Sequence, residues 1–197
     1  KGVMLTHRNL LAATLSYFSD VDSIAPDDCV LHAAPMSHGS GIYLLPHVAH
    51  GALNAVPESG GFEPAEIFEL LRAHRGVTMF AAPTMVKRLV DHGDSSPLPG
   101  LKTIVYGGGP MYVEELKKSL AAFGQVFVQI YGQGESPMTI TWVRREDHVT
   151  GDDAILGSVG VPRTGVDVRV VGEDGQDVAV DAIGEIIVRG DVVMAGY

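Results

Sequence analysis

Hydrophobic and polar positions change spacing in a regular way over the first two-thirds of the chain. Segments with apolar residues at helical spacing alternate with short apolar runs that are typical of buried strands. The predicted strands are 28–34, 77–81, 101–106 and 126–130, and the predicted helices begin at residues 7 and 64 and span 41–50, 83–92 and 111–123. Thr6 can cap the first helix, and Pro46 is expected to bend or end the helix that it interrupts. Helices of this length between strands indicate crossover connections, so we expect an α/β fold with a mostly parallel sheet flanked by helices.

The spacing changes near Gly157. Two alternating runs follow, 166–171 and 185–189, and the first is followed by the glycine-containing turn 172–175. Alternation of this kind is typical of antiparallel strands. We therefore expect residues 1–156 to form the α/β part of the fold and residues 157–197 to begin a small antiparallel, barrel-like β subdomain.

The composition narrows the class of protein. Hydrophobic residues make up 46% of the 197 residues and charged residues only 19%, which indicates a folded domain with a sizeable core. The formal net charge of -10 argues against a nucleic-acid partner. Cys29 is the only cysteine, so no intrachain disulfide forms; we expect a buried small hydrophobe and a reducing, cytoplasmic compartment. No stretch approaches the roughly 20 apolar residues of a membrane-spanning helix.

Three consecutive glycines, Gly107, Gly108 and Gly109, come directly after the predicted strand 101–106. Open α/β sheets bind ligands at the carboxyl ends of their strands, and glycine lets a flat or anionic group lie directly on the backbone there. A tight strand-to-helix turn without a ligand explains this segment about equally well.

The next predicted strand ends in a second unusual segment. It holds Gln129, Tyr131, Gly132, Gln133, Gly134 and Glu135. A carboxylate beside two glycines at this edge suits Mg²⁺ held together with substrate phosphates, and the Tyr131 ring offers a flat face for stacking on a base. Taken alone, a loop with one solvated glutamate and one core tyrosine is the simpler interpretation. The two segments follow neighbouring strands, so we expect one shared nucleotide site, although no Walker loop, G-x-G-x-x-G fingerprint or G-x-S-x-G elbow is present.

Five segments in order along the chain resemble motifs of the adenylate-forming superfamily, which includes acyl-CoA synthetases, firefly-luciferase-like enzymes and the adenylation domains of peptide synthetases. They are residues 1–10, 35–41, 106–110, 131–135, and 184–190 with 196–197. In that order they are similar to the end of the phosphate loop, the motif with the acyl-pocket gate, the adenine-binding turn, the Tyr-Gly-x-Thr-Glu motif and a later Gly-Glu-Leu…Gly-Tyr element. The resemblance covers the whole chain, but the chain covers less than half of a family member. We therefore expect a central fragment of the N-terminal domain, without the ribose-binding Asp and the mobile C-terminal domain with its catalytic Lys.

The resemblance implies a role for each matching residue. Lys1 would approach the ATP phosphates, Glu135 would hold Mg²⁺, and His38 would close the carboxylate pocket as a gate. The other nucleotide-binding residues would be Gly107, Gly108 and Gly109 along adenine, Gln129 near its amino group, Tyr131 stacked on it, and Gly132, Gln133 and Gly134 of the same motif. The chain departs from the motif at Gly134, where the family has a Thr whose hydroxyl would bond the α-phosphate. A backbone N–H, Ser136 or Thr139 is expected to replace that hydroxyl, or binding is weaker.

Together these features predict an AMP-forming acid–thiol ligase that uses ATP and Mg²⁺ to activate a fatty or aromatic carboxylic acid and passes the acyl group to CoA. The fragment alone is expected to be inactive. Two alternatives stay open: an adenylation domain that loads an amino acid onto a carrier protein, and a non-catalytic nucleotide-binding module, which Gly134 would favour. A homodimer is left open as well. His47 and His50 have a spacing that can suit a metal ion, but no third ligand lies nearby in sequence, so packing or surface positions are favoured.

Overall fold

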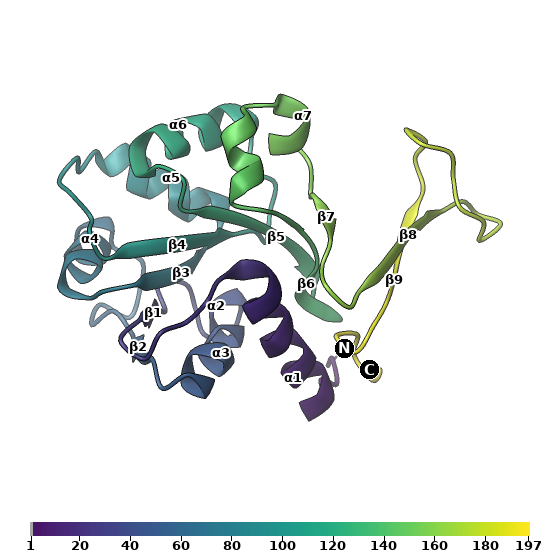
Figure 1. The fold of residues 1–197 in the computed structure, drawn as a ribbon, viewed down its shortest axis with the longest axis horizontal. Helices are drawn as coiled ribbons and strands as arrows, with labels where there is room; N and C mark the ends of the chain where they lie inside the picture. Colours follow the sequence, from purple (N-terminus) through teal and green to yellow (C-terminus); the bar gives the residue numbers. More distant parts are fainter. Residues whose placement is uncertain (1) are drawn as a thin grey trace.

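Seven strands form one twisted sheet at the centre of the protein (Figure 1). The computed structural model describes residues 2–197, so Lys1 and its expected phosphate contact lie outside the described residues. The sheet order is β2-β1-β3-β4-β5-β6-β7. Neighbouring strands from β2 to β5 are parallel, and β6 and β7 are antiparallel to their neighbours. The strands are β1 (Cys29–Leu31), β2 (Leu53–Ala55), β3 (Val77–Ala81), β4 (Leu101–Tyr106), β5 (Phe127–Gln133), β6 (Ser136–Val143) and β7 (Val161–Pro162).

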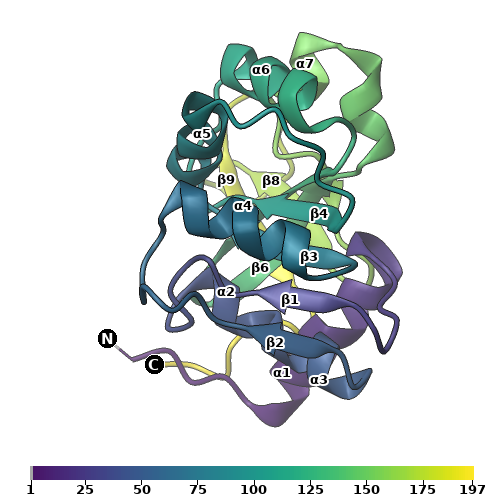
Figure 2. The same cartoon turned by 90° about the vertical axis from the view of Figure 1, so that its left-hand side faces the viewer.

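Helices cover both faces of this sheet (Figure 2). One layer consists of α4 (Pro64–Ala73), α5 (Pro83–His92), α6 (Val113–Phe123) and the short helices η2 (Glu146–Thr150) and α7 (Asp153–Leu156). The other consists of α1 (His7–Ser16), the π-helical turn η1 (Tyr17–Val21), α2 (Gly39–Ile42) and α3 (Leu44–Ala49). Each layer has its own apolar cluster, because alternate strand residues point to opposite faces: Ile104 joins the first and Val105 the second. These observations confirm the predicted α/β fold.

Several elements run as the sequence predicts, and others do not. The bounds of β3, α5 and β4 are those expected, and Thr6 caps α1 through its side chain. The single helix expected over 41–50 is instead two short helices that meet at Tyr43. The break expected from Pro46 falls at Tyr43, three residues before it, and Pro46 itself lies inside α3 as its third residue. An amide nitrogen in the first turn of a helix has no intrahelical acceptor, so proline costs no hydrogen bond there.

The C-terminal part contains the expected antiparallel pair. Strands β8 (Asp167–Val171) and β9 (Glu185–Arg189) form a separate two-stranded sheet, which stands away from the main body (Figure 1). Strand β7 still pairs with β6 in the large sheet, so the small sheet itself begins only at Asp167. The division of the chain into domains at residues 156 and 157 stays a prediction.

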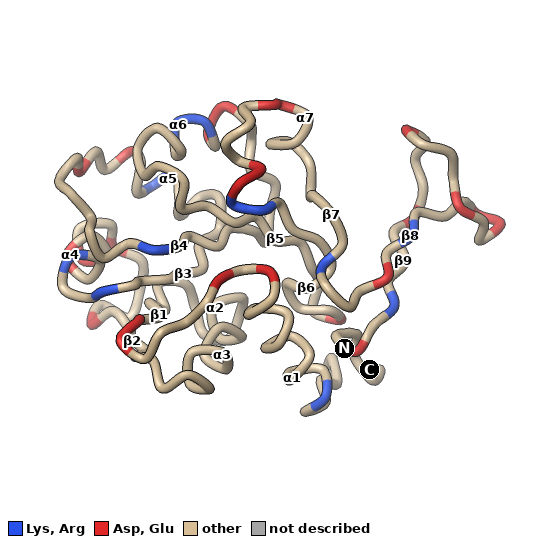
Figure 3. Tube along the Cα trace, in the orientation of Figure 1, with Lys and Arg blue, Asp and Glu red and all other residues tan. Residues whose placement is uncertain are grey.

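Charged residues are spread over many elements (Figure 3). Along the described chain, Lys and Arg are spread over several helices and strands and do not gather in one stripe. None of the helices in residues 2–197 has the length and apolar character needed to cross a bilayer.

Candidate functional site

The two glycine-rich segments meet at one edge of the sheet. Strands β4 and β5 pair in parallel, with Tyr106 opposite Gln129, so both strands end on the same side. A Cβ on Gly107 would lie only 2.4 Å from the carbonyl oxygen of Ile130. The turn after β4 therefore packs directly against the backbone of β5, one residue before Tyr131.

The His38 segment approaches the same glycine turn through one aromatic ring. Phe80 lies near the end of β3 and is 7% exposed. A Cβ on Gly39 would lie 2.7 Å from the Phe80 ring, and one on Gly108 would lie 3.8 Å from it. Phe80 is thus packed between the start of α2 and the turn after β4. The His38 side chain is exposed, and its Nδ1 lies 3.0 Å from the Ser37 hydroxyl.

Glu135 lies at the tip of a hairpin that sequence reasoning missed. Strand β5 continues to Gln133, which pairs with Ser136 at the start of β6, so Gly134 and Glu135 form the turn. The two strands come very close below this tip: a Cβ on Gly132 would lie 2.3 Å from the amide nitrogen of Met138. Glycine is required there by this close approach.

A cleft of about 170 Å³ collects three of the predicted site residues. The hairpin contributes Tyr131, Gln133, Glu135, Ser136 and Ile140 to the lining. The C-terminal part contributes Ile186, Val188 and Val193. The lining does not include the glycine turn 107–109, Gln129 or His38. The structure therefore places Tyr131, Gln133 and Glu135 in the cleft, whereas Gly108 and the residue after His38 lie beside Phe80.

Contacts from the C-terminal segment hold Glu135 in place. The Tyr197 hydroxyl donates a hydrogen bond to the Glu135 carboxylate, and this bond lowers the pKa of that carboxyl below its ordinary value. The Met194 N–H donates to the Glu135 carbonyl oxygen at 2.8 Å. The Ala195 N–H donates to the Met4 carbonyl oxygen at 3.0 Å, so the segment around Met4 lies beside the C-terminal segment at the hairpin. Sequence reasoning matched Tyr197 to a motif but did not connect it with Glu135.

Two polar details bear on what this edge can bind. Gln129 is 9% exposed, and its side-chain oxygen has no hydrogen-bond partner. A buried acceptor of this kind is costly unless a donor such as a ligand amino group reaches it. The hydroxyls of Ser136 and Thr139, expected as substitutes at Gly134, are both buried and lie 3.0 Å apart in a hydrogen bond with each other.

His47 and Cys29 are buried, and His50 is exposed. His47 is fully buried and its Nδ1–H donates to the Tyr43 carbonyl oxygen at 2.7 Å, whereas the His50 ring packs on Phe18. Among residues 2–197 no group of three or more His, Cys, Asp or Glu side chains is arranged to hold a metal ion. Cys29 is buried, which raises the pKa of its thiol to about 11.

Comparison with known proteins assigns the family. The sequence pattern described as AMP-binding enzyme matches residues 1–197, which is the whole chain. The chain belongs to the AMP-binding enzyme family. This membership confirms the resemblance drawn from the five sequence motifs.

Two relatives within the AMP-binding enzyme family are longer CoA ligases. The chain is 31% identical over 199 residues to the medium/long-chain-fatty-acid–CoA ligase FadD8 of Mycobacterium tuberculosis, covering 100% of this chain and 34% of that protein. It is 33% identical over 201 residues to a feruloyl-CoA synthase of an Amycolatopsis species, covering 100% of this chain and 39% of that one. The chain therefore spans less than two-fifths of the length of these relatives.

A solved structure shares the fold of this AMP-binding enzyme segment. The O-succinylbenzoate coenzyme A synthetase MenE of Bacillus subtilis, in complex with ATP and a magnesium ion, superimposes with a TM-score of 0.87 at 27% identity. The match covers 100% of this chain and 40% of MenE. It supports the fold described above, and the individual residue roles stay predictions.

Proposed function

We propose that this chain is the central part of an enzyme that activates a fatty or aromatic carboxylic acid with ATP and then transfers the acyl group to CoA. The reaction forms acyl-AMP and pyrophosphate in its first step. The observation that carries the proposal is the meeting of the Gly107–Gly109 turn and the Glu135 hairpin at one edge of parallel strands β4 and β5. Ligands of open α/β sheets bind at this edge.

The residues at this edge fit an adenine nucleotide. The backbone at Gly109 has open space where a side chain would stand, so a flat ring can lie on it. The unpartnered oxygen of Gln129 would accept a hydrogen bond from the adenine amino group, and Tyr131 would stack on the base. Lys1 would contact the phosphates, and Gly132, Gln133 and Gly134 would offer backbone N–H groups and close approach.

Glu135 fits the role of a magnesium ligand. Its carboxyl has a lowered pKa and lines the cleft, so it is ionised and accessible at neutral pH. Mg²⁺ bound there together with the phosphates would neutralise the charge on the departing pyrophosphate. The exposed His38, next to Gly39 and Phe80, would close the acid pocket as a gate. Adenylation then depends on holding the carboxylate in line with the α-phosphorus.

The class of acid and the acceptor are inferred from the relatives and from the residues of the predicted acid pocket. The relatives named above are ligases for a fatty acid and for ferulate, which supports a fatty or aromatic acid and CoA. An adenylation domain for amino acids would need an acidic group for the α-amino group, and residues 39–49 contain none. Gly134 favours the non-catalytic module. No observation supports a homodimer, and a cytoplasmic location stays a prediction.

The function is tested on the full-length protein with ATP, Mg²⁺ and a panel of acids, by measuring pyrophosphate and AMP release. Release with fatty or aryl acids supports the proposal, release with amino acids supports a carrier-protein enzyme, and ATP binding without release supports a binding module. Glu135→Gln should reduce release at least 100-fold, in the range typical of lost electrostatic stabilisation. Glu69→Gln is the matched control, because Glu69 is an exposed carboxylate on α4 away from this edge.

The 197-residue chain on its own should not catalyse acid-dependent pyrophosphate exchange. The proposed enzyme needs a ribose-binding Asp and a catalytic Lys that lie outside this sequence. Steady exchange by the purified chain would refute this part of the proposal.

A further inference from the structure

The side chain of Asn9 joins the first turn of α1 to the C-terminal segment 191–197. Its amide nitrogen donates to the carbonyl oxygens of Asp191 and Val193, at 2.7 and 2.8 Å. A side-chain amide has two N–H donors, and both are used here. Asn9 is only 7% exposed, so these bonds lie largely out of water. Asn9 therefore ties together two parts of the chain that are 182 and 184 residues apart in sequence.

The oxygen of the same amide is used at the start of α1. It accepts hydrogen bonds from the N–H and the hydroxyl of Thr6, each at 2.8 Å. The Asn9 N–H donates in return to the Thr6 hydroxyl at 3.2 Å. These bonds fix the orientation of the amide, but a carboxylate at this position of a helix can cap it in the same way. Helix capping therefore does not explain why the position carries a nitrogen.

One peptide group connects Asn9 with Glu135. The Val193 carbonyl oxygen accepts from Asn9, and the N–H of the same peptide group is that of Met194. The Met194 N–H donates to the Glu135 carbonyl oxygen at 2.8 Å. Hydrogen bonds on the two sides of one peptide group polarise it and strengthen each other. The position of the Glu135 backbone is thus linked to Asn9 by two consecutive hydrogen bonds.

Other contacts between the same two segments do not replace this link. Arg8 and Asp191 form an ion pair at 2.6 Å, but their side chains are 75% and 58% exposed, so the pair contributes little. Met4 exchanges backbone hydrogen bonds with Ala195 and Gly196, further along the C-terminal segment. Asn9 supplies a buried side-chain link between the segments.

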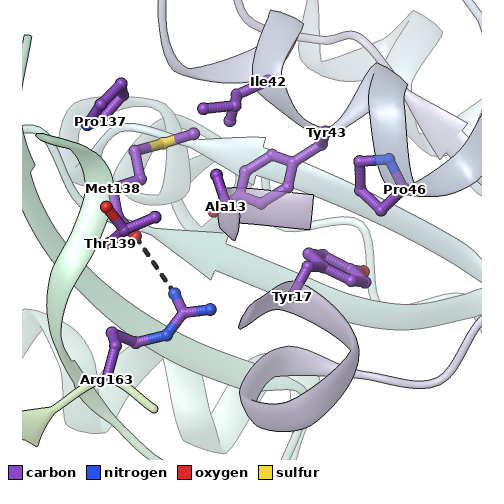
Figure 4. A pocket seen from close by; sticks show the side chains of 9 residues that line it. All are labelled: Ala13, Tyr17, Ile42, Tyr43, Pro46, Pro137, Met138, Thr139 and Arg163. Carbon is purple, nitrogen blue, oxygen red and sulfur yellow. Dashed lines mark hydrogen bonds between the residues drawn. The ribbon is translucent and has the colours of Figure 1, made fainter. Parts of the chain in front are cut away.

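The hairpin that carries Glu135 is held independently at a second place. Arg163 donates to the Met138 carbonyl oxygen on β6 at 3.1 Å, and Figure 4 shows its guanidinium reaching toward this strand. Arg163 is itself fixed by Asp20, to which its Nε–H donates at 2.7 Å. Loss of the Asn9 bonds should therefore displace the tip with Glu135 and leave the two strands paired.

We propose that Asn9 is a positioning residue that sets where the Glu135 carboxylate meets Mg²⁺. The inference rests on the proposed function, in which Glu135 holds Mg²⁺ together with the ATP phosphates. Loss of a residue that orients a metal ligand typically weakens metal affinity about 10- to 100-fold, although the residue does not touch the metal. The Asn9 amide is then needed for Mg²⁺ to strengthen ATP binding, and not for ATP binding itself.

The test measures the ATP affinity of the full-length protein by calorimetry, with saturating Mg²⁺ and with EDTA. The ratio of the two affinities is the gain that Mg²⁺ provides. Asn9→Asp keeps the oxygen for the cap but loses both N–H donors, so the gain should fall about tenfold, toward the value in Glu135→Gln. The ATP affinity in EDTA should stay close to that of the wild-type protein.

Two further variants separate this role from general loosening of α1. Asn9→Ala removes the two donors without adding a charge and should give the same loss as Asn9→Asp. Thr6→Ala weakens the cap but leaves the Asn9 amide and its bond from the Thr6 N–H, so the gain should be that of the wild-type protein. An equal loss of the gain in Thr6→Ala would assign the effect to the helix end and overturn the inference. The two Asn9 variants leave different groups at the cap, so poor folding of one, seen by thermal unfolding, does not hide the answer.

A double variant shows whether Asn9 acts through Glu135. When Glu135→Gln is already present, Asn9→Asp should cause no further loss of the gain, because the two residues act in one chain of contacts. A further loss would mean a separate role for Asn9 and overturn the inference. Equal losses of ATP affinity with Mg²⁺ and with EDTA, or a wild-type gain in both Asn9 variants, would overturn it too.

Failure of the proposed function would give a different result. ATP binding that Mg²⁺ strengthens equally in the wild-type protein and in Glu135→Gln would remove Mg²⁺ from Glu135, and the inference with it. Absence of ATP binding would overturn the proposed function as a whole. Acid-dependent pyrophosphate release together with an unchanged gain in both Asn9 variants would overturn the inference alone.

Discussion

Arg163 and Asp20 form an ion pair in the interior of the protein, with Nε and Oδ2 2.7 Å apart and both side chains 2% exposed. The pair joins η1 to the segment after β7. Burial raises the pKa of Asp20, but hydrogen bonds from Thr164 and Arg163 outweigh that effect and hold it below its ordinary value. Asp20 therefore stays ionised at neutral pH.

Breaking this pair on one side should destabilise the protein strongly. Arg163→Ala or Asp20→Ala alone should lower the free energy of unfolding by about 3–5 kcal/mol, because each leaves an uncompensated buried charge. The double variant should lose less than the sum of the two. Urea denaturation of the 197-residue chain measures all three. Losses below about 1 kcal/mol for the single variants would show that the pair is hydrated in solution.

The buried His148 should make stability depend on pH. Its Nδ1–H donates to the Arg144 carbonyl oxygen, so its Nε2 accepts a hydrogen bond from the Tyr106 hydroxyl at 3.0 Å. Burial lowers the pKa of His148 below its usual 6.5, so the folded protein holds the neutral ring. This contribution is complete above pH 6.5 and is lost as the pH falls below it, because the unfolded chain binds the proton more readily.

Urea denaturation at pH 7.5, 6.5 and 5.5 checks this prediction. The free energy of unfolding should fall over this range. His148→Gln should flatten the change, and a variant at the exposed His7 serves as the matched control. An unaltered slope in His148→Gln would assign the effect to other groups, among them the buried His47, whose pKa burial also lowers.

Local sequence patterns predicted the buried strands and the helix between them correctly. Strand β3 is buried along its whole length and β4 from Thr103 to Tyr106, and both are mostly apolar. Helix α5 begins at a proline and ends before Gly93, which has a left-handed conformation. Strand β6 was missed because Pro137 and Met138 interrupt its pattern at the place where Gly132 lets the strands approach. A proline near a hairpin tip does not prevent strand pairing. The sequence around Pro137 alone, however, does not show that this segment pairs with β5.

The candidate site was predictable only in part, because some of its contacts join segments that are far apart in the sequence. Chain order and the parallel arrangement placed Gly107–Gly109 beside the segment that contains Tyr131. The contact that holds Glu135 joins distant segments, because Tyr197 and Glu135 are separated by 62 residues. Such pairs are set by the tertiary fold and leave no periodic signal in the sequence.

Two substitutions in the glycine turn should affect nucleotide binding and stability separately. Gly109→Ala adds a methyl group in open space, so the chain should keep its stability while the full-length protein binds ATP more weakly, by about tenfold. Gly107→Ala would push against the Ile130 carbonyl oxygen and should cost about 1–3 kcal/mol of stability. Gly61→Ala, also in open space but far along the chain, is the control for both. ATP titration and thermal unfolding make the two measurements. Unchanged ATP affinity in Gly109→Ala would remove this turn from the site.

Tyr197 should tune the pH dependence of the enzyme through Glu135. The hydrogen bond from the Tyr197 hydroxyl is the main cause of the lowered pKa of Glu135, so Tyr197→Phe should raise that pKa. Glu135 would then accept a proton at higher pH, and the acid limb of the kcat/KM profile of the full-length protein should move to higher pH. Activity at pH 8 should change less than twofold, because the carboxylate is ionised there in both proteins. Tyr112→Phe, at another exposed tyrosine, is the matched control. Superimposable profiles for Tyr197→Phe and the wild-type protein would show that Glu135 does not govern the acid limb.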